Sequence, residues 1–493
     1  MSKVSNAFFI FPLAFLCVFL SAVDLFSQNV NATITLDAKA ATLSIRGKDN
    51  NLSKNLSFLK SGIGAADLAD RISNLELTDQ HGKPVSYKRF SAGEYVADAV
   101  FSGWSYGVSI LSPMNPRASA HVSWLTDDTG ILMLDDLLPQ PPKSVGQRTA
   151  TIAIEVPAGW RIVTSEKMIS ASGMYEVSDI QKAVFLIGTD IRETKINIGN
   201  SVLNIADSGQ WLFTDAELSG VVQEIFKEFK SLFGSGPEGN LHILLVPFPR
   251  KNIQTGTWEA ETRGRTVSIV SADMPFKTQS LQRLHEQMRH EIFHLWLPNG
   301  VNLSGNYDWF YEGFALYQAL KTGVELNQIR FDDFLDTLSR AHNIDTMQIR
   351  PMSLTDASQN RASGDDTQIY ARGLLVAFLC DLSLLQSSKG KRKVADIFRR
   401  LYTSHRPPNP ASDANKAVLE VFASYPELAS VVGGYVKGSQ KVDWQVLLES
   451  AGIENEPGSL RTNLRVKTKL NGRQKALLDK LGYNNWRKLT RKS

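Results

Sequence analysis

Residues 290–317 read HEIFHLWLPNGVNLSGNYDWFYEGFALY, and this stretch carries the strongest structural signal in the 493-residue chain. It begins with His290 and His294, which are four residues apart. On an α-helix that spacing places both imidazoles on one face, where their nitrogens can converge on one Zn²⁺. The pattern therefore predicts a metal-binding helix, with Ser280 as a candidate N-cap and Pro298 as a candidate end.

The glutamate inside this motif is a candidate general base. Glu291 is rotated by about 100° from His290, so it can face the open coordination position without being a ligand. There it can take a proton from water that the zinc activates. By the same geometry His285 and Glu286 lie on another face, and we interpret both as exposed helix residues.

A catalytic zinc also needs a third protein ligand. Glu312 lies 18 residues beyond His294. A turn through residues 298–300, followed by a second helix with Asn306 as candidate cap, would bring Glu312 back against the first helix. An unpaired carboxylate would be costly among its apolar neighbours Trp309, Phe310, Phe314 and Leu316. The sequence therefore predicts a His₂Glu zinc site.

The segments on either side of this stretch differ in pattern. Residues 32–205 contain short β-branched or apolar runs between turn signals, which favour a sandwich or open barrel, and its His81 and His121 have no ligand-spaced partner. Thr214 is the candidate cap of a helix that ends at Gly234. Strand candidates follow at 241–246 and 266–271, and the pattern is mostly helical from 280 to about 455.

The first residues predict export. Lys3 precedes the apolar run 7–22, which is shorter than the roughly 20 residues of a spanning helix, and we expect a signal peptide cleaved between about 22 and 32. An uncleaved signal anchor is the alternative. Cleavage would leave Cys380 as the single cysteine, in an apolar stretch typical of a buried core thiol. The expected location is periplasmic or extracellular.

Composition narrows the class of protein. With 43% hydrophobic residues, 34 Gly and 19 Pro, the chain is neither collagen-like nor wholly disordered. The net charge of +4 is uneven: residues 461–493 hold eleven Lys and Arg against Asp479, a balance of +10, so the rest sums to 4 − 10 = −6. This tail can contact an anionic surface, or be a solvated terminal helix with Ala476, Leu477, Leu478 and Leu481 at helical spacing. Export argues against nucleic acid as a partner.

Three motifs together resemble the glycyl aminopeptidase family of zinc metallopeptidases, which are gluzincins: HEIFHLW at 290–296, WFYEGFALY at 309–317 and YARGLL at 370–375. The resemblance implies a β-rich N-terminal domain, a thermolysin-like catalytic domain and a helical C-terminal domain. It also implies that His290, His294 and Glu312 bind one Zn²⁺, that Glu291 is the general base, and that Tyr370 stabilises the oxyanion.

The same resemblance points to residues that hold the substrate. The family has a Gly-Gly-Leu-Glu-His-like segment that contacts the N-terminal end of the peptide, and the comparable segment here is GTWEA at 256–260. Gly256 and Glu259 match it, and a carboxylate can pair with the substrate α-ammonium. Glu261 competes for this role. The other three positions of the segment and Ala315, where the family commonly has Thr, depart from the pattern.

We therefore expect an α+β multidomain chain with five segments: a signal peptide at 1–28, a β-rich domain at 32–205, a thermolysin-like catalytic domain at 206–325, a helical domain at 326–455 and a basic tail at 456–493 that is too short for the family's PDZ domain. The expected function is that of a zinc aminopeptidase acting on peptides. A zinc endopeptidase or oligopeptidase, and a non-catalytic peptide- or surface-binding protein that keeps the fold, are the alternatives. No pattern in the sequence predicts an oligomeric state.

Overall fold

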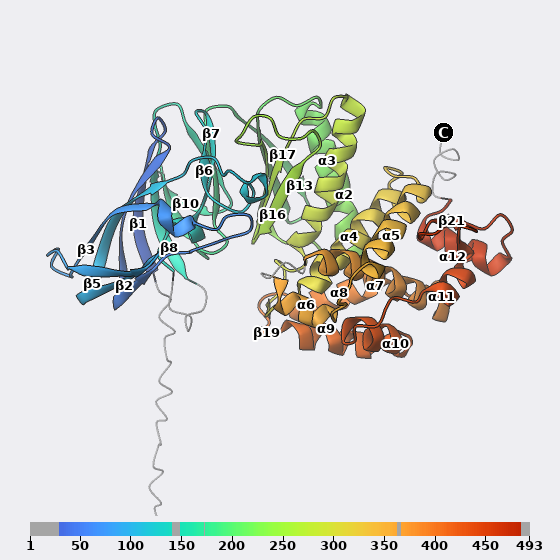
Figure 1. Cartoon of the computed structure of the whole chain (residues 1–493). Helices are drawn as coiled ribbons and strands as arrows, with labels where there is room; N and C mark the ends of the chain where they lie inside the picture. Colours follow the sequence, from blue (N-terminus) through green and yellow to red (C-terminus); the bar gives the residue numbers. More distant parts are fainter. Residues whose placement is uncertain (1–28, 141–147, 172, 362–365, 485–493) are drawn as a thin grey trace, which may run out of the picture.

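The computed structural model describes residues 29–140, 148–171, 173–361 and 366–484. Successive parts of the chain follow one another across the molecule, from N-terminal strands through a mixed sheet to C-terminal helices (Figure 1). The expected α+β architecture is confirmed. The signal peptide predicted at 1–28 lies outside the described residues.

Two sheets form the N-terminal part. The first contains β1 (Asn29–Asp37), β2 (Thr42–Ser57), β3 (Ile72–Thr78), β4 (Tyr87–Ser91), β5 (Glu94–Ser109), β8 (Thr149–Glu155), β10 (Lys167–Ser170) and β11 (Met174–Val177), in the order β10-β11-β8-β1-β2-β5-β3 with β4 on β5. The second contains β6 (Trp124–Leu125), β7 (Thr129–Met133), β9 (Arg161–Thr164) and β12 (Val184–Gly188), and the short helix α1 (Leu134–Leu137) follows β7. Ile34 of β1 and Phe185 of β12 belong to one buried core, so the two sheets pack together.

A mixed five-stranded sheet supports the catalytic motifs. Its strands are β13 (Ile191–Ile198), β14 (Ser201–Ser208), β15 (Gly239–Pro247), β16 (Trp258–Arg263) and β17 (Thr266–Ser271), in the order β13-β14-β15-β17-β16. The strands expected at 241–246 and 266–271 are present. The domain boundary expected between 205 and 206 falls inside β14. This strand pairs in parallel with β15, so it belongs to the five-stranded sheet as a whole. The edge strand β16 lies beside the motif helix.

The helix predicted from Thr214 is confirmed. α2 (Asp215–Phe233) begins with a capping box, in which the Thr214 side chain accepts from the Glu217 backbone and the Glu217 side chain accepts from the Thr214 backbone. It ends at Gly234, which has a left-handed φ of 84°. One face of α2 is buried against the sheet and the motif helix, as the spacing of its apolar residues indicates.

The ends of the two motif helices differ from the prediction. α3 (Lys277–Glu291) starts before Ser280, whose backbone N–H already donates to the carbonyl of Phe276. The chain then tightens into a 3₁₀ turn over Ile292–Leu295, so α3 ends well before Pro298. α4 (Asp308–Glu325) begins after Tyr307, and the expected cap at Asn306 is therefore wrong.

Two long helices of the C-terminal part cross closely. α4 packs on α7 (Asp366–Ser387) with Gly313 against Gly373: a Cβ on Gly313 would lie 2.4 Å from the Gly373 Cα. Only glycine allows this approach. By length and composition α7 is apolar enough to span a bilayer, but 94% of its apolar 18-residue window is buried inside the molecule. Cys380 on α7 is a buried thiol, as expected.

The remaining helices surround α7. They are α5 (Phe331–Thr346), α6 (Leu354–Gln359), α8 (Val394–His405), α9 (Ala414–Ala423), α10 (Ala429–Val431), α11 (Gln445–Ala451) and α12 (Gly472–Leu481), with the short strand pairs β18 (Leu303–Ser304) with β19 (Ser412–Asp413) and β20 (Ile453–Asn455) with β21 (Leu464–Val466). The helix expected in the basic tail is α12, which buries Leu477, Leu478 and Leu481. Arg465 pairs with Glu454 and Lys467 pairs with Glu449, so part of the tail's charge is neutralised within the chain.

Candidate active site

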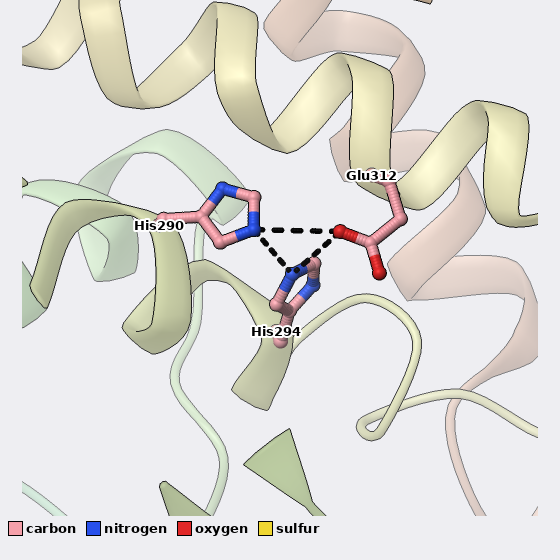
Figure 2. Close-up of side chains that lie close together, drawn as sticks. All are labelled: His290, His294 and Glu312. Atoms are coloured by element: carbon pink, nitrogen blue, oxygen red, sulfur yellow. Dashed lines mark hydrogen bonds and ion pairs between the residues drawn. The ribbon is translucent and has the colours of Figure 1, made fainter. Parts of the chain in front are cut away.

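Three buried side chains from consecutive helical segments meet at one point (Figure 2). His290 comes from the end of α3, His294 from the 3₁₀ turn that follows, and Glu312 from α4. The two Nε2 atoms are 3.3 Å apart. Oε2 of Glu312 lies 3.4 Å from Nε2 of His290 and 3.6 Å from Nε2 of His294. The structure thus brings the predicted ligand trio together.

The donor atoms of this trio fit a zinc ion. Ligands at about 2.0–2.1 Å in a tetrahedral site are separated by roughly 3.3 Å, close to the distances found here. Nδ1 of His294 lies 2.9 Å from the carbonyl oxygen of Leu297. Donation from Nδ1–H to this carbonyl leaves the Nε2 lone pair directed at the centre of the trio. Two nitrogens and one carboxylate oxygen that share an enclosed point are the donor set of a His₂Glu zinc site.

The electrostatics of the trio also call for a cation. Burial raises the pKa of Glu312, but the hydrogen bonds and charges of His290 and His294 outweigh it and hold this pKa well below its ordinary value. Burial lowers the pKa of His294, but the hydrogen bond and charge of Glu312 outweigh it and raise this pKa to about 9. The carboxylate therefore stabilises positive charge at the centre of the trio, which a metal ion would supply.

Glu291 lies beside the trio and is held by the edge strand. Its side chain is buried, and Oε1 lies 4.0 Å from Nε2 of His290. The Thr262 hydroxyl of β16 donates to Oε2 of Glu291 at 2.8 Å. This hydrogen bond fixes the carboxylate next to the metal position without making it a ligand. The geometry matches the separation of ligand and base roles expected from the HExxH spacing.

Tyr370 approaches the trio from α7. Burial and the charge of Glu312 raise the pKa of Tyr370 well above its ordinary value, so the phenol keeps its proton at neutral pH. Arg361 donates from Nη2 to the Tyr370 oxygen at 3.2 Å and contacts Oε1 of Glu312 at 3.4 Å. Arg361 also pairs with Asp308 and Asp366. The side chain of Arg361 therefore links the tyrosine to the third member of the trio.

These residues line one cleft of about 560 Å³. Glu259 of β16 lies in its wall, and its carboxylate has no hydrogen-bond or ion-pair partner among the described residues. Burial raises the pKa of Glu259, and the charges of His121 and Arg117 partly offset this effect. The competing Glu261 pairs with His121 at 2.8 Å and with Arg263 at 2.9 Å. Glu259 is therefore the free carboxylate of the two.

Gly256, His285 and His121 lie in positions that differ from those expected from the sequence. Gly256 is outside the lining of the cleft, in the turn before β16, with a φ of 77°. His285 is buried with only 8% of its surface exposed, so its interpretation as an exposed residue is wrong, whereas Glu286 is exposed. Other parts of the chain therefore cover α3 on the side of His285, and the spacing within the motif gives no information about this. His121 lies in the cleft through its contact with Glu261.

Sequence reasoning missed Thr262 and Arg361. One feature of the sequence could have indicated Thr262. Strand alternation places it on the same face of β16 as Trp258 and Ala260, which belong to the segment at 256–260. Arg361 is preceded and followed by no recognisable motif. It reaches the site through its own ion pairs with Asp308 and Glu312, which are distant from it in sequence.

Solved structures of other proteins share this architecture. The aminopeptidase N family protein from Idiomarina loihiensis matches 90% of this chain and 82% of its own, with a TM-score of 0.73 and 15% identity. A mutant of the M1 zinc metallopeptidase from Deinococcus radiodurans, bound to a Tyr-Ser-Ala substrate, matches 85% of this chain and 95% of its own, with a TM-score of 0.54 and 13% identity. The chain has the fold of the M1 zinc metallopeptidases.

A two-domain M1 zinc metallopeptidase mutant bound to L-arginine also shares the M1 fold, with a TM-score of 0.52, 12% identity and coverage of 85% of this chain and 95% of its own. No family model and no curated protein matches the sequence. The α+β architecture implied by the resemblance is thereby confirmed at the level of fold. Within this fold α3, α4 and α7 each bring at least one of the candidate site residues to a single cleft.

Proposed function

We propose that this chain is a zinc-dependent metallopeptidase that removes N-terminal residues from peptides. One observation carries the proposal: His290, His294 and Glu312 place three ligand atoms 3.3–3.6 Å apart, in the same cleft as the carboxylate of Glu291 and the phenol of Tyr370. Each role in metal-assisted hydrolysis then has an occupant in position. The M1 fold supports this proposal independently of the individual side chains.

The residues of the chain divide the chemistry between them. When bound, zinc supplies a Lewis acid that polarises the scissile carbonyl and makes water nucleophilic near neutral pH. Glu291 takes the proton from the attacking water and later passes it to the leaving amine, so no net proton is consumed by the protein. Thr262 keeps the Glu291 carboxylate oriented for both transfers. Tyr370, which keeps its proton, donates its O–H toward the negative charge that develops on the carbonyl oxygen.

Glu259 supports an exopeptidase rather than an endopeptidase. Its partly buried carboxylate is unpaired, so it can pair with the α-ammonium of a peptide and set which bond reaches Glu291. A substrate without a free N-terminus would leave this buried charge uncompensated. A tripeptide and a free amino acid occupy two of the structures with this fold, which is consistent with a cleft of this kind.

Export remains part of the proposal. Lys3 and the apolar run 7–22 support a signal peptide and a periplasmic or extracellular location. Contact of the basic tail with an anionic surface is likewise a prediction from residues 461–493. A fusion of residues 1–35 to a reporter that is active only after export tests the first point directly, because replacement of Lys3 and three of the apolar residues by Asp should abolish its activity.

The peptidase proposal is tested with purified protein of measured zinc content. A peptide library, half of it N-acetylated, is incubated with the protein and the products are identified by mass spectrometry. We expect stepwise loss of N-terminal residues from the free peptides only. Glu291→Gln should abolish this cleavage while zinc content and thermal stability stay unchanged, since Glu291 is not a ligand.

Two further variants sharpen this test. Glu259→Gln should raise KM for free peptides and reduce the discrimination against acetylated ones. Glu420→Gln is the matched control, because Glu420 is exposed on α9 outside the lining of the cleft. Internal cuts in acetylated peptides would identify an endopeptidase instead. Absence of any cleavage by zinc-loaded protein would leave a non-catalytic binding protein as the better description.

A further inference from the structure

Arg289 is a buried cation without a counter-charge in contact. It precedes His290 on α3, only 3% of its surface is exposed, and it lines the candidate active-site cleft. Nε and Nη1 are buried without a hydrogen-bond partner, and no carboxylate among the described residues lies within ion-pair distance. A buried guanidinium without a counter-charge favours the binding of an anion.

The surroundings of Arg289 are built to leave it room. Its guanidinium lies over Gly323 of α4, where a Cβ would stand 3.0 Å from Cζ. Any larger residue at position 323 would push the guanidinium out of place. Glu286, about one turn earlier on α3, already pairs with Arg283 at 2.8 Å. Arg289 therefore keeps both its place and its unmatched charge.

Arg289 lies on the flank of α3 opposite to the edge strand. It is two residues before Glu291, which on an α-helix is a rotation of about 200°. Since Glu291 faces Thr262 of β16, Arg289 faces α4 instead. Arg340 of α5, whose Nη2 donates to Thr337, also lines the cleft. The lining thus combines the free carboxylate of Glu259, the cations of Arg289 and Arg340, and the metal-binding trio.

We propose that Arg289, assisted by Arg340, forms a subsite for a carboxylate of the peptide substrate. This inference rests on the proposed peptidase function and specifies its substrate class: peptides that carry an anionic group close to the scissile bond. The carboxylate is either the free C-terminus of a short peptide or the side chain of Asp or Glu after the first residue. Arg favours such a partner because its guanidinium is charged and carries several N–H donors.

Two pairs of peptides distinguish these two sources. Ala-Ala-Ala is compared with Ala-Ala-Ala amide for the C-terminal carboxylate, and Ala-Glu-Ala amide with Ala-Gln-Ala amide for a side chain. For at least one pair we expect kcat/KM to be about 10- to 100-fold higher for the peptide with the carboxylate, as one charge-assisted contact provides. Arg289→Met should remove this preference, so that the two peptides of that pair are cleaved with equal kcat/KM. Arg289→Lys should retain part of it.

Binding supplies a second readout that does not need turnover. In the Glu291→Gln background, calorimetry with the same peptides should show the same preference for a carboxylate, lost on adding Arg289→Met. Arg399→Met, a substitution on the exposed surface of α8, serves as a control for the loss of one positive charge. Thermal denaturation completes the set: a structural arginine would lower the melting temperature when replaced, whereas an unpaired one should not.

The outcomes separate this inference from the peptidase proposal. Equal cleavage and equal binding of all four peptides by the wild type would overturn the carboxylate subsite while leaving the peptidase intact. A preference that survives in Arg289→Met would overturn the role of Arg289. If none of the four peptides is cleaved, the peptidase proposal fails on them, and the calorimetric comparison still decides whether Arg289 binds a carboxylate.

Discussion

The hydroxyl of Thr262 lies 2.8 Å from Oε2 of Glu291 and 3.1 Å from the Glu291 carbonyl oxygen. A side chain of the edge strand β16 therefore contacts both ends of the candidate base residue. Thr262 donates a hydrogen bond, so it holds a carboxylate that must accept and release a proton in one place. The same strand carries Glu259, which also lines the cleft.

Thr262→Val should lower kcat by about 10-fold with little change in KM, because the isosteric side chain keeps the packing but loses the donor. Thr262→Ser should restore most of the activity, since it keeps the hydroxyl. Steady-state kinetics on the best peptide measure both. Equal kcat values for Val and wild type would show that the Glu291 carboxylate needs no help from β16.

Glu312→Ala should reduce zinc content to less than one tenth of the wild-type value after dialysis against a weak chelator. The remaining His290 and His294 provide only two ligands, whereas a catalytic zinc site uses three protein ligands. Elemental analysis of the dialysed protein measures the loss. Glu261→Ala is the control, because Glu261 lies in the same cleft but pairs with His121 and Arg263; its zinc content should equal that of the wild type.

Arg361→Met should lower both stability and turnover. The substitution leaves Asp308, Asp366 and Glu312 without their shared cation, which we expect to cost about 1–3 kcal/mol in the free energy of unfolding. It also removes the donor to the Tyr370 oxygen, so kcat should fall by about 10-fold. Urea unfolding and kinetics separate the two effects. Tyr370→Phe should lower kcat without the loss of stability.

Gly313→Ala and Gly220→Ala should change stability in opposite directions. At Gly313 the new methyl group would lie 2.4 Å from the Gly373 Cα, so α4 and α7 must move apart and unfolding becomes easier by about 1–3 kcal/mol. Gly220 on α2 has no atom within 4 Å of a built Cβ, so alanine should stabilise this helix by up to about 1 kcal/mol. A stable, fully active Gly313→Ala would mean that the two helices need no such close contact.

His242→Leu should flatten the loss of stability in mild acid. Burial lowers the pKa of His242 from 6.5 to about 4, so the unfolded chain binds a proton in this range more readily than the folded one. The contribution of the neutral His242 to the free energy of unfolding is therefore fully present above pH 6.5 and is lost as the pH falls toward 4. Integrated over this window, the difference amounts to about 3 kcal/mol. Chemical denaturation of both proteins at pH 7.5 and pH 4.5 measures it, and parallel curves would contradict the assignment.

The ligand trio and the base could be predicted from the sequence because their geometry is almost entirely local. His290 and His294 lie four residues apart in adjoining helical turns, and Glu312 follows on α4, the next α-helix of the chain. The secondary structure around them was predicted less well at its ends. Ser280 and Asn306 have the chemistry of caps, but α3 begins at Lys277 after Phe276, and α4 begins at Asp308 after Tyr307.

Glu259 and Tyr370 occupy an intermediate position. Both were identified by resemblance, and neither has a local pattern that distinguishes it from the other glutamates and tyrosines of the chain. The structure places both in the cleft and adds the property that matters for each: Glu259 is unpaired, while Tyr370 keeps its proton beside Glu312. Gly256, matched by the same reasoning, lies outside the lining because the turn ends before the strand reaches the cleft.

The sequence by itself determined the metal-binding chemistry, since helix periodicity converts a spacing of four residues into two converging imidazoles. Only the tertiary structure decided which side chains surround that chemistry. Thr262, Arg361 and Arg289 act on or near the site through segments that the chain brings together from β16, the loop before α7 and the far flank of α3. Their partners are distant in sequence or on another face of the helix, and no local spacing encodes such contacts.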